Sequence, residues 1–229
     1  MRGLIILHNG RTWNLEIFMS TSQAHQLAVL SRVNNLKLNQ LKTQEVILDS
    51  RRRKTTIQPL YIDGGCVERV SSLRFLGVHL EEDLSWRTNT TAIVKRAQQR
   101  LYFLRVLRNL HLRQDLLVSF YRCSVESILT YCICVWFCSC TAAERKALQR
   151  VVNSPQKIIG CPLPSLEELY NSRCLKKAAN ILKDPSHPGN SHFDRLPSGR
   201  RFRTMRTRTN KLKNSFYIRA ITALNTAGM

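Results

Sequence analysis

The residues IVKRAQQRLYFLR, at positions 93–105, form the clearest helical pattern in the chain. Ile93, Ala97, Leu101 and Leu104 recur at intervals of three and four residues, which places them on one side of an α-helix. Basic residues are interpreted as occupying the opposite side. The pattern predicts a long amphipathic helix, starting near Thr88, that buries its apolar stripe and turns its basic side to solvent.

The sequence that follows continues as helix. A second helix is expected from Arg113 to Phe137, and two more near residues 142–159 and 166–183. The last two each begin with a hydroxyl residue followed three positions later by a glutamate, Thr141 with Glu144 and Ser165 with Glu168, which is the capping-box spacing. Pro155 lies inside the third helix and is expected to kink or shorten it. Residues 184–190 form a loop, and a final helix is expected at 211–224.

The sequence that precedes position 88 predicts a small sheet with one helix. Ser20 or Thr21 caps a helix that ends near Asn34, and residues 45–49 form a strand. Residues 60–62 and 66–70 form a hairpin around Asp63-Gly64-Gly65, and residues 73–80 form a further buried strand. The fold class is therefore α+β: a small N-terminal antiparallel sheet with one helix, followed by a mostly α-helical bundle and a basic C-terminal tail. The expected divisions are 1–19, which is poorly specified, then 20–86, 87–183 and 184–229.

The charge balance points to a polyanionic partner. The 229 residues include 36 Lys and Arg against 15 Asp and Glu, a net charge of +21, which exceeds what solubility requires. A hydrophobic content of 43% indicates a folded chain.

The basic residues are concentrated in three blocks that could release counterions from nucleic-acid phosphates. No acidic residue occurs from Arg195 onward. A single block could equally be a solvated face, and a helical interaction module that binds no nucleic acid is the alternative if the charges are scattered around the fold. The candidate nucleic-acid-binding residues are Arg51, Arg52, Arg53, Lys54, Lys95, Arg96, Arg100, Arg105, Arg108, Arg200, Arg201, Arg203, Arg206, Arg208, Lys211 and Lys213.

The expected location is intracellular, in the cytoplasm or nucleus, with no membrane partner. The apolar run Leu4–Leu7 is too short for a signal peptide, and residues 128–137 are too few for a spanning helix, so they are interpreted as a buried core helix. Eight cysteines in a chain of this length are more typical of reduced thiols than of a disulfide scaffold. The oligomeric state is left open.

No pattern specifies a catalytic or metal site, and no cofactor is expected. Cys132, Cys134, Cys138 and Cys140 could supply a tetrahedral zinc set, but their apolar helical setting favours core packing. His192-Phe193-Asp194 has the spacing of two ligands in an iron facial triad and lacks a third ligand after it. Adjacent aspartates and a phosphate-cradling glycine loop do not occur.

Aromatic residues are the other candidates for nucleic-acid contact, because bases stack on their rings. Tyr102, Phe103 and most of the others sit at helical spacing, which favours the core. Phe202, within Arg200-Arg201-Phe202-Arg203, is the aromatic residue expected to face a nucleic acid.

Several motifs resemble one family in the order in which that family has them. The chain resembles the region downstream of the catalytic palm in LINE-type retrotransposon reverse transcriptases, especially those of fish, over about residues 30–226. The motifs are Asn34–Asn39, Lys42-Thr43, Val46–Asp49, Val67–Val70, Phe75–Val78, Leu84–Trp86, Lys95–Arg105, Phe120-Tyr121, Glu126–Leu129, Arg145–Val152 and Leu196–Arg201.

The resemblance implies a palm-end subdomain at 20–86, a thumb-like helical domain at 87–183 and a trailing basic region, which together hold primer–template duplex or element RNA. It also implies a noncatalytic remnant, because the family's aspartate pair would lie before Asn34, and residues 1–25 do not supply it.

A shorter segment, about residues 50–100, resembles the N-terminal domain of alkylated DNA repair protein AlkB homologue 8. This second resemblance implies methyltransferase and 2-oxoglutarate-dependent dioxygenase activities. The sequence lacks the residues for both activities.

Overall fold

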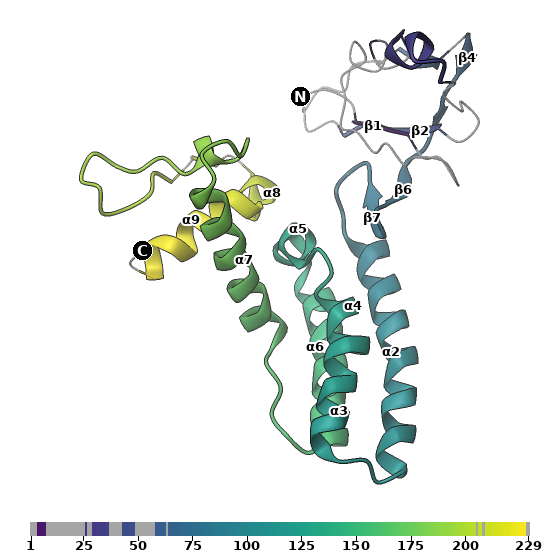
Figure 1. Cartoon of the computed structure of the whole chain (residues 1–229), viewed down its shortest axis with the longest axis vertical. Helices are drawn as coiled ribbons and strands as arrows, with labels where there is room; N and C mark the ends of the chain where they lie inside the picture. Colours follow the sequence, from purple (N-terminus) through teal and green to yellow (C-terminus); the bar gives the residue numbers. More distant parts are fainter. Residues whose placement is uncertain are drawn as a thin grey trace. The chain divides into compact units, whose positions relative to one another are not determined.

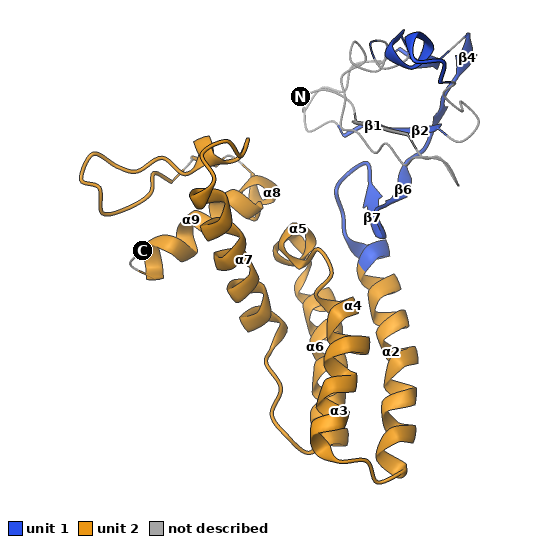
Figure 2. Cartoon of the chain, viewed as in Figure 1, with its two compact units in different colours: residues 1–89 blue, residues 90–229 orange. Residues whose placement is uncertain are grey.

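The computed structural model describes residues 4–7, 26, 29–36, 43–48, 58–62, 64–204, 206–207 and 209–227. The chain divides into two compact units, residues 1–89 and 90–229 (Figure 2). Short strands occur in the first unit and helices dominate the second (Figure 1), which confirms the α+β class. The boundary between the two units falls in the first turn of a long helix. The expected division into four segments, 1–19, 20–86, 87–183 and 184–229, stays a prediction.

The described residues of the first unit form three small sheets. Strands β1 (Leu4–Leu7), β2 (Thr43–Val46) and β5 (Glu68–Arg69) form one sheet in the order β1-β2-β5. β1 pairs with β2 antiparallel, and β5 pairs with β2 parallel, so the expected sheet is not antiparallel throughout. The strand expected at 45–49 begins earlier, at Thr43, and ends at Val46.

The predicted hairpin around Gly64 forms, but its return strand is short. β3 (Tyr61–Ile62) pairs antiparallel with β4 (Gly65–Cys66), and Gly64 has a φ of 81°, which an L side chain rarely adopts. The chain then leaves the hairpin, because residues 68–69 pair with β2. The return strand, which was expected to continue to Val70, therefore ends at Cys66, and one further hydrogen bond joins Val67 N to the carbonyl oxygen of Leu60 at 2.8 Å.

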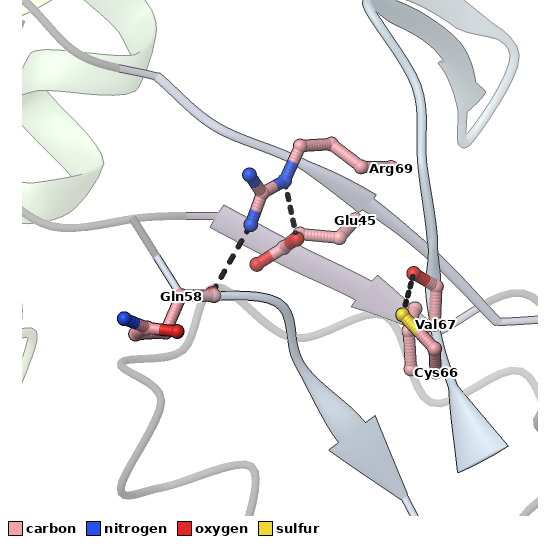
Figure 3. A network of polar contacts seen from close by, with 5 residues as sticks. All are labelled: Glu45, Gln58, Cys66, Val67 and Arg69. Carbon is pink, nitrogen blue, oxygen red and sulfur yellow. Dashed lines mark hydrogen bonds and ion pairs between the residues drawn. The ribbon is translucent and has the colours of Figure 1, made fainter. Parts of the chain in front are cut away.

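A buried carboxylate holds β5 against β2 (Figure 3). Glu45 is 4% exposed, and its Oε2 accepts a hydrogen bond from Arg69 Nε at 2.8 Å. Arg69 Nη2 donates to the carbonyl oxygen of Gln58 at 3.1 Å, so the same guanidinium also ties down the segment before β3. A charge that is removed from water needs such a partner, which explains why this pairing is specific.

Residues 73–80, expected as a single strand, form a hairpin instead. β6 (Ser72–Phe75) pairs antiparallel with β7 (Val78–Glu81) through the two-residue turn Leu76-Gly77. Both turn residues have positive φ, 44° and 85°, as hairpin turns that match the strand twist require. The leucine masked the turn in the sequence, because the apolar run continued through it.

The helix expected before residue 34 ends where predicted. Residues 29–33 are helical and turn at Asn34-Asn35, where Asn35 has a φ of 55°. Leu30 and Val33 are 59% and 75% exposed. The expected caps, Ser20 and Thr21, lie outside the described residues.

The long helix α2 (Arg87–Asn109) buries its predicted stripe. Ile93, Ala97, Leu101 and Leu104 are at most 5% exposed. The apolar period therefore located the inner side of α2 correctly.

The helix expected at 113–137 is broken into α3 (Gln114–Tyr121), a π-helix (Arg122–Glu126), α4 (Ser127–Leu129), α5 (Ile133–Trp136) and a 3₁₀ turn (Phe137–Ser139). The break lies at Cys132, whose φ is 49°. Trp136 is buried, and its Nε1 donates to the carbonyl oxygen of Tyr131 at 2.8 Å, so the indole satisfies a carbonyl at the break.

Residues 114–139 are long and apolar enough, by length and composition alone, to cross a membrane. Core helices of soluble proteins meet the same test. Leu117, Tyr121, Val125, Leu129 and Ile133 are at most 1% exposed, so one side of this segment is core, whereas only 33% of the apolar window is buried.

Helices α6 (Ala142–Ile159) and α7 (Leu166–Lys183) have the predicted bounds, and both capping boxes form. Glu144 N donates to Thr141 Oγ1 at 3.3 Å, and Thr141 N donates to the Glu144 carboxylate at 2.7 Å. Ser165 and Glu168 repeat the arrangement at 3.2 and 2.7 Å. Pro155 is buried and α6 continues through it to Ile159, so the expected shortening is wrong, and the alternative of a kink stays a prediction.

The C-terminal segment is packed against α7 rather than extended as a tail. After a 3₁₀ turn (Asn190–His192), two helices, α8 (Asn210–Lys213) and α9 (Phe216–Ala227), replace the expected helix at 211–224. α7 and α9 pack together (Figure 1). Their shared core is Ala178, Ile181, Phe193, Phe202, Ala220, Ile221 and Leu224.

Candidate nucleic-acid interface

The structure describes two of the three basic blocks. The α2 block comprises Lys95, Arg96, Arg100, Arg105 and Arg108, and the C-terminal block comprises Arg200, Arg201, Arg203, Arg206, Lys211 and Lys213. Arg51, Arg52, Arg53, Lys54 and Arg208 lie outside the described residues.

The α2 block lies on a helix without acidic residues. Four of its five members are exposed, and Arg96 is half-buried. Within the described part of the chain, none of the five pairs with a carboxylate. By contrast, Arg113, beyond the end of α2, is held by Asp115 at 2.7 Å and lowers the pKa of that carboxyl.

The arginines of α2 flank the buried stripe instead of lying opposite to it. Each residue turns the helix by about 100°. At that rotation Arg96 and Arg105 lie on either side of the stripe, roughly 90° from its centre, while Arg100 and Arg108 lie nearer to it and Lys95 lies opposite. The side expected to be basic also carries Tyr102, Phe103 and Val106, which are 61%, 48% and 39% exposed. The sequence analysis assigned both aromatic rings to the core. Tyr102 and Phe103 fall between Leu101 and Leu104 and so lie outside the spacing of the buried stripe, which is the signal that could have placed them in solvent.

The C-terminal block lies partly on a hydrogen-bonded loop. Leu196 N donates to the carbonyl oxygen of Arg201 at 2.8 Å, and Arg203 N donates to that of Asp194 at 2.7 Å. Arg195 Nη1 donates to the carbonyl oxygen of Gly199 at 2.8 Å, which closes the turn. These bonds fix the backbone and leave the neighbouring arginine side chains in solvent.

Four exposed guanidiniums on this segment have no acidic partner among the residues described: those of Arg200, Arg201, Arg203 and Arg206. An unpaired exposed guanidinium keeps all its donors available, and its planar fork matches the oxygens of a phosphate. These four arginines can therefore bind a phosphodiester backbone without first breaking an ion pair to another described residue.

Phe202 is in the core, so its expected contact with nucleic acid is wrong. It is 3% exposed, its ring lies edge-on to Phe193 at 6.2 Å, and the Arg195 guanidinium lies 4.7 Å from its centroid. Asn225 of α9 holds its backbone, accepting from Phe202 N at 2.8 Å and donating to its carbonyl at 3.1 Å. The hydrophobic partner on α7 and α9 could not be inferred from the flanking arginines.

The four clustered cysteines are placed differently from one another. Cys138 and Cys140 are buried as expected, Cys134 is half-buried, and Cys132 is exposed at the helix break. Burial raises the pKa of Cys140 to about 11. A hydrogen bond with Cys174 of α7, aided by the charges of Lys177 and Arg173, lowers the pKa of Cys134 to about 7.

The described residues do not form a metal or iron site. No group of three or more His, Cys, Asp or Glu side chains among them converges on one point. His192 is exposed, and its ring packs against Tyr217 at 4.4 Å between centroids. A facial triad around His192 and Asp194 therefore does not fit this part of the chain.

Comparison with known proteins gives one family match. Residues 86–127 match the family model described as the N-terminal part of alkylated DNA repair protein alkB homolog 8. This segment covers α2, α3 and the π-helix, and it lies further along the chain than the segment at 50–100 that the sequence suggested. No curated protein and no solved structure matches the chain.

Proposed function

We propose that this chain is a noncatalytic nucleic-acid-binding protein that contacts phosphates through the α2 block and the C-terminal block. The observation that carries the proposal is the row of unpaired guanidiniums at Arg200, Arg201, Arg203 and Arg206 on a hydrogen-bonded loop. A net charge of +21 adds long-range attraction for a polyanion. Under this proposal the protein works in the cytoplasm or nucleus.

Salt dependence of binding tests this function. Each phosphate that is neutralised releases counterions, so affinity should fall steeply between roughly 50 and 200 mM salt. Filter binding of the full chain to labelled RNA and DNA, titrated over that range, gives the slope. Binding that is absent, or that keeps its affinity as salt rises, would overturn the proposal.

A proposal about origin accompanies this one. We infer that the chain derives from the palm end, thumb and trailing region of a LINE-type reverse transcriptase, on the strength of the ordered motifs between residues 34 and 201. Such a segment would grip primer–template or element RNA. A transcript that encodes an in-frame Asp-Asp pair upstream of Met1 would replace the noncatalytic reading with a polymerase.

The match at residues 86–127 favours a second candidate, a protein of the AlkB homologue 8 type. That relative's name denotes repair of alkylated DNA, so the match suggests a nucleic-acid context. Within the segment His111 is the single histidine, and the described residues do not fit an iron ion.

Turnover of 2-oxoglutarate in the presence of iron separates the two candidates. Under the noncatalytic proposal, the parent chain and the His192→Ala variant should show the same background turnover of 2-oxoglutarate. Turnover that His192→Ala abolishes would establish the enzyme instead.

A further inference from the structure

The aromatic pair on α2 lies in solvent although the helix already has a complete buried side. Tyr102 and Phe103 are 61% and 48% exposed, while Leu101 and Leu104 on either side of them are buried. The two rings meet edge-on, with centroids 5.6 Å apart and planes at 74°. Two adjacent large rings in water leave apolar area that a ligand could cover.

Cationic and amide side chains surround this pair. Arg100 lies three residues before Phe103, and Arg105 lies three residues after Tyr102, so each ring has an exposed arginine one turn away on the helix surface. Gln98 and Gln99 are also exposed on the preceding turn.

The charge on α2 selects among possible occupants. The helix carries six basic and no acidic residues, so the same face of a second copy would bring like charges together. An apolar peptide would cover the rings and leave the arginines without partners. A polyanion with aromatic groups satisfies both features at once.

A duplex cannot use the rings as stacking surfaces, because its base faces are covered by neighbouring bases. An unpaired strand exposes those faces, and stacking on aromatic side chains is a common way to bind it. Because the planes of Tyr102 and Phe103 are 74° apart, each ring offers its own face.

We propose that α2 binds single-stranded nucleic acid, with bases stacked on Tyr102 and Phe103 and adjacent phosphates held by Arg100 and Arg105. The inference rests on the proposed function and specifies its ligand. It also gives α2 and the C-terminal block different tasks, since the latter presents cations without an exposed aromatic residue.

The test compares a labelled 12-nucleotide single strand with the duplex of the same sequence, using fluorescence anisotropy on the full chain. The variant Tyr102→Leu/Phe103→Leu keeps apolar side chains and removes both stacking faces. Val106→Ala/Leu110→Ala is the matched control, because both side chains are exposed and lie further along the same side of the helix as the two rings. Thermal melting by circular dichroism confirms that both variants are folded.

The leucine variant should bind the single strand about tenfold or more weakly, with an unchanged salt slope. Its duplex affinity, and both affinities of the control, should stay within about twofold of the parent, because phosphate contacts are intact.

Other outcomes identify what fails. Salt-sensitive binding that the leucine variant leaves unchanged for the single strand overturns the stacking inference and leaves the proposed function standing. Equal losses for strand and duplex also overturn it. Parent chains that self-associate in sedimentation, and leucine variants that do not, show that the pair is a contact between copies. Absence of any salt-sensitive binding defeats both proposals.

Discussion

Phe103 and Phe202 each lie near arginines, yet one ring is 48% exposed and the other 3% exposed. Phe202 has the more basic neighbourhood and is nevertheless buried, because α7, α9 and Phe193 surround it. Phe103 sits on a helix whose buried stripe lies on another side. Local charge therefore does not tell whether an aromatic residue packs or binds, whereas the availability of a partner surface does.

The largest expected effect is on Phe202. Phe202→Ala should lower the free energy of unfolding by about 3–5 kcal/mol, because it removes a ring from a closed core. Phe103→Ala is the matched change and should cost well under about 1 kcal/mol, since an exposed side chain loses little packing. Urea unfolding monitored by circular dichroism measures both. Equal losses, or a stable Phe202→Ala protein that no longer binds nucleic acid, would contradict the distinction.

The second effect concerns the charges around Phe202. Changing Arg200, Arg201, Arg203 and Arg206 to Gln should weaken nucleic-acid binding by about 10²-fold at low salt and reduce the salt slope by up to about four. The control removes the same charge elsewhere by changing Lys146, Arg150, Lys157 and Lys183, exposed residues of α6 and α7, to Gln. Filter binding at several salt concentrations compares the two. Equal slopes would mean that only net charge matters.

The third effect is a pH dependence of cysteine alkylation. It concerns Cys134 of α5, which contacts Cys174 of α7, the helix that helps to bury Phe202. The thiolate is the reactive form, and the pKa of Cys134 is lowered to about 7. Its alkylation rate should therefore rise about tenfold per pH unit below 7 and level off above it. Cys140, which is buried and whose pKa is raised to about 11, should stay unlabelled over the same range in the folded protein.

Iodoacetamide labelling followed by peptide mass spectrometry gives both profiles. Lys177→Gln removes a nearby cation and should move the Cys134 midpoint upward, towards the ordinary value of a thiol. A Cys134 midpoint near 9 in the parent would contradict the contact with Cys174.

The smallest effect concerns the first turn of α7. Ser165→Ala removes the side chain that accepts from Glu168 N and should cost about 1 kcal/mol of stability. Ser198→Ala, on the exposed loop before Phe202, is the control and should change stability by less than about 0.5 kcal/mol. Thermal unfolding of the two variants measures the difference. A control loss as large as that of Ser165→Ala would show that the loop, rather than the cap, limits the stability of this region.

Local patterns gave three helices of the second unit, α2, α6 and α7, with accuracy. The bounds of α6 and α7 followed from hydroxyl and glutamate side chains that bond within one turn of each other. The stripe of α2 followed from spacing along a single helix. These features depend on neighbours within four residues, so the order of residues contains the needed information.

Features that depend on distant partners were not recoverable in this way. β5 pairs with β2 across more than twenty residues, and Leu76-Gly77 turns because β6 and β7 pair. Cys132 interrupts an apolar run where the Trp136 indole bonds back to Tyr131.

The order of residues alone established a basic chain, the inner side of α2, the bounds of α6 and α7, and a segment without acidic residues from position 195 onward. The folded structure determined which aromatic rings reach solvent, reversing the expectation for Phe202 and for the pair Tyr102 and Phe103. The physical reason is that a side chain is buried only when a second surface packs against it. A helix specifies its own apolar side, but the segment that covers any other ring comes from elsewhere in the chain.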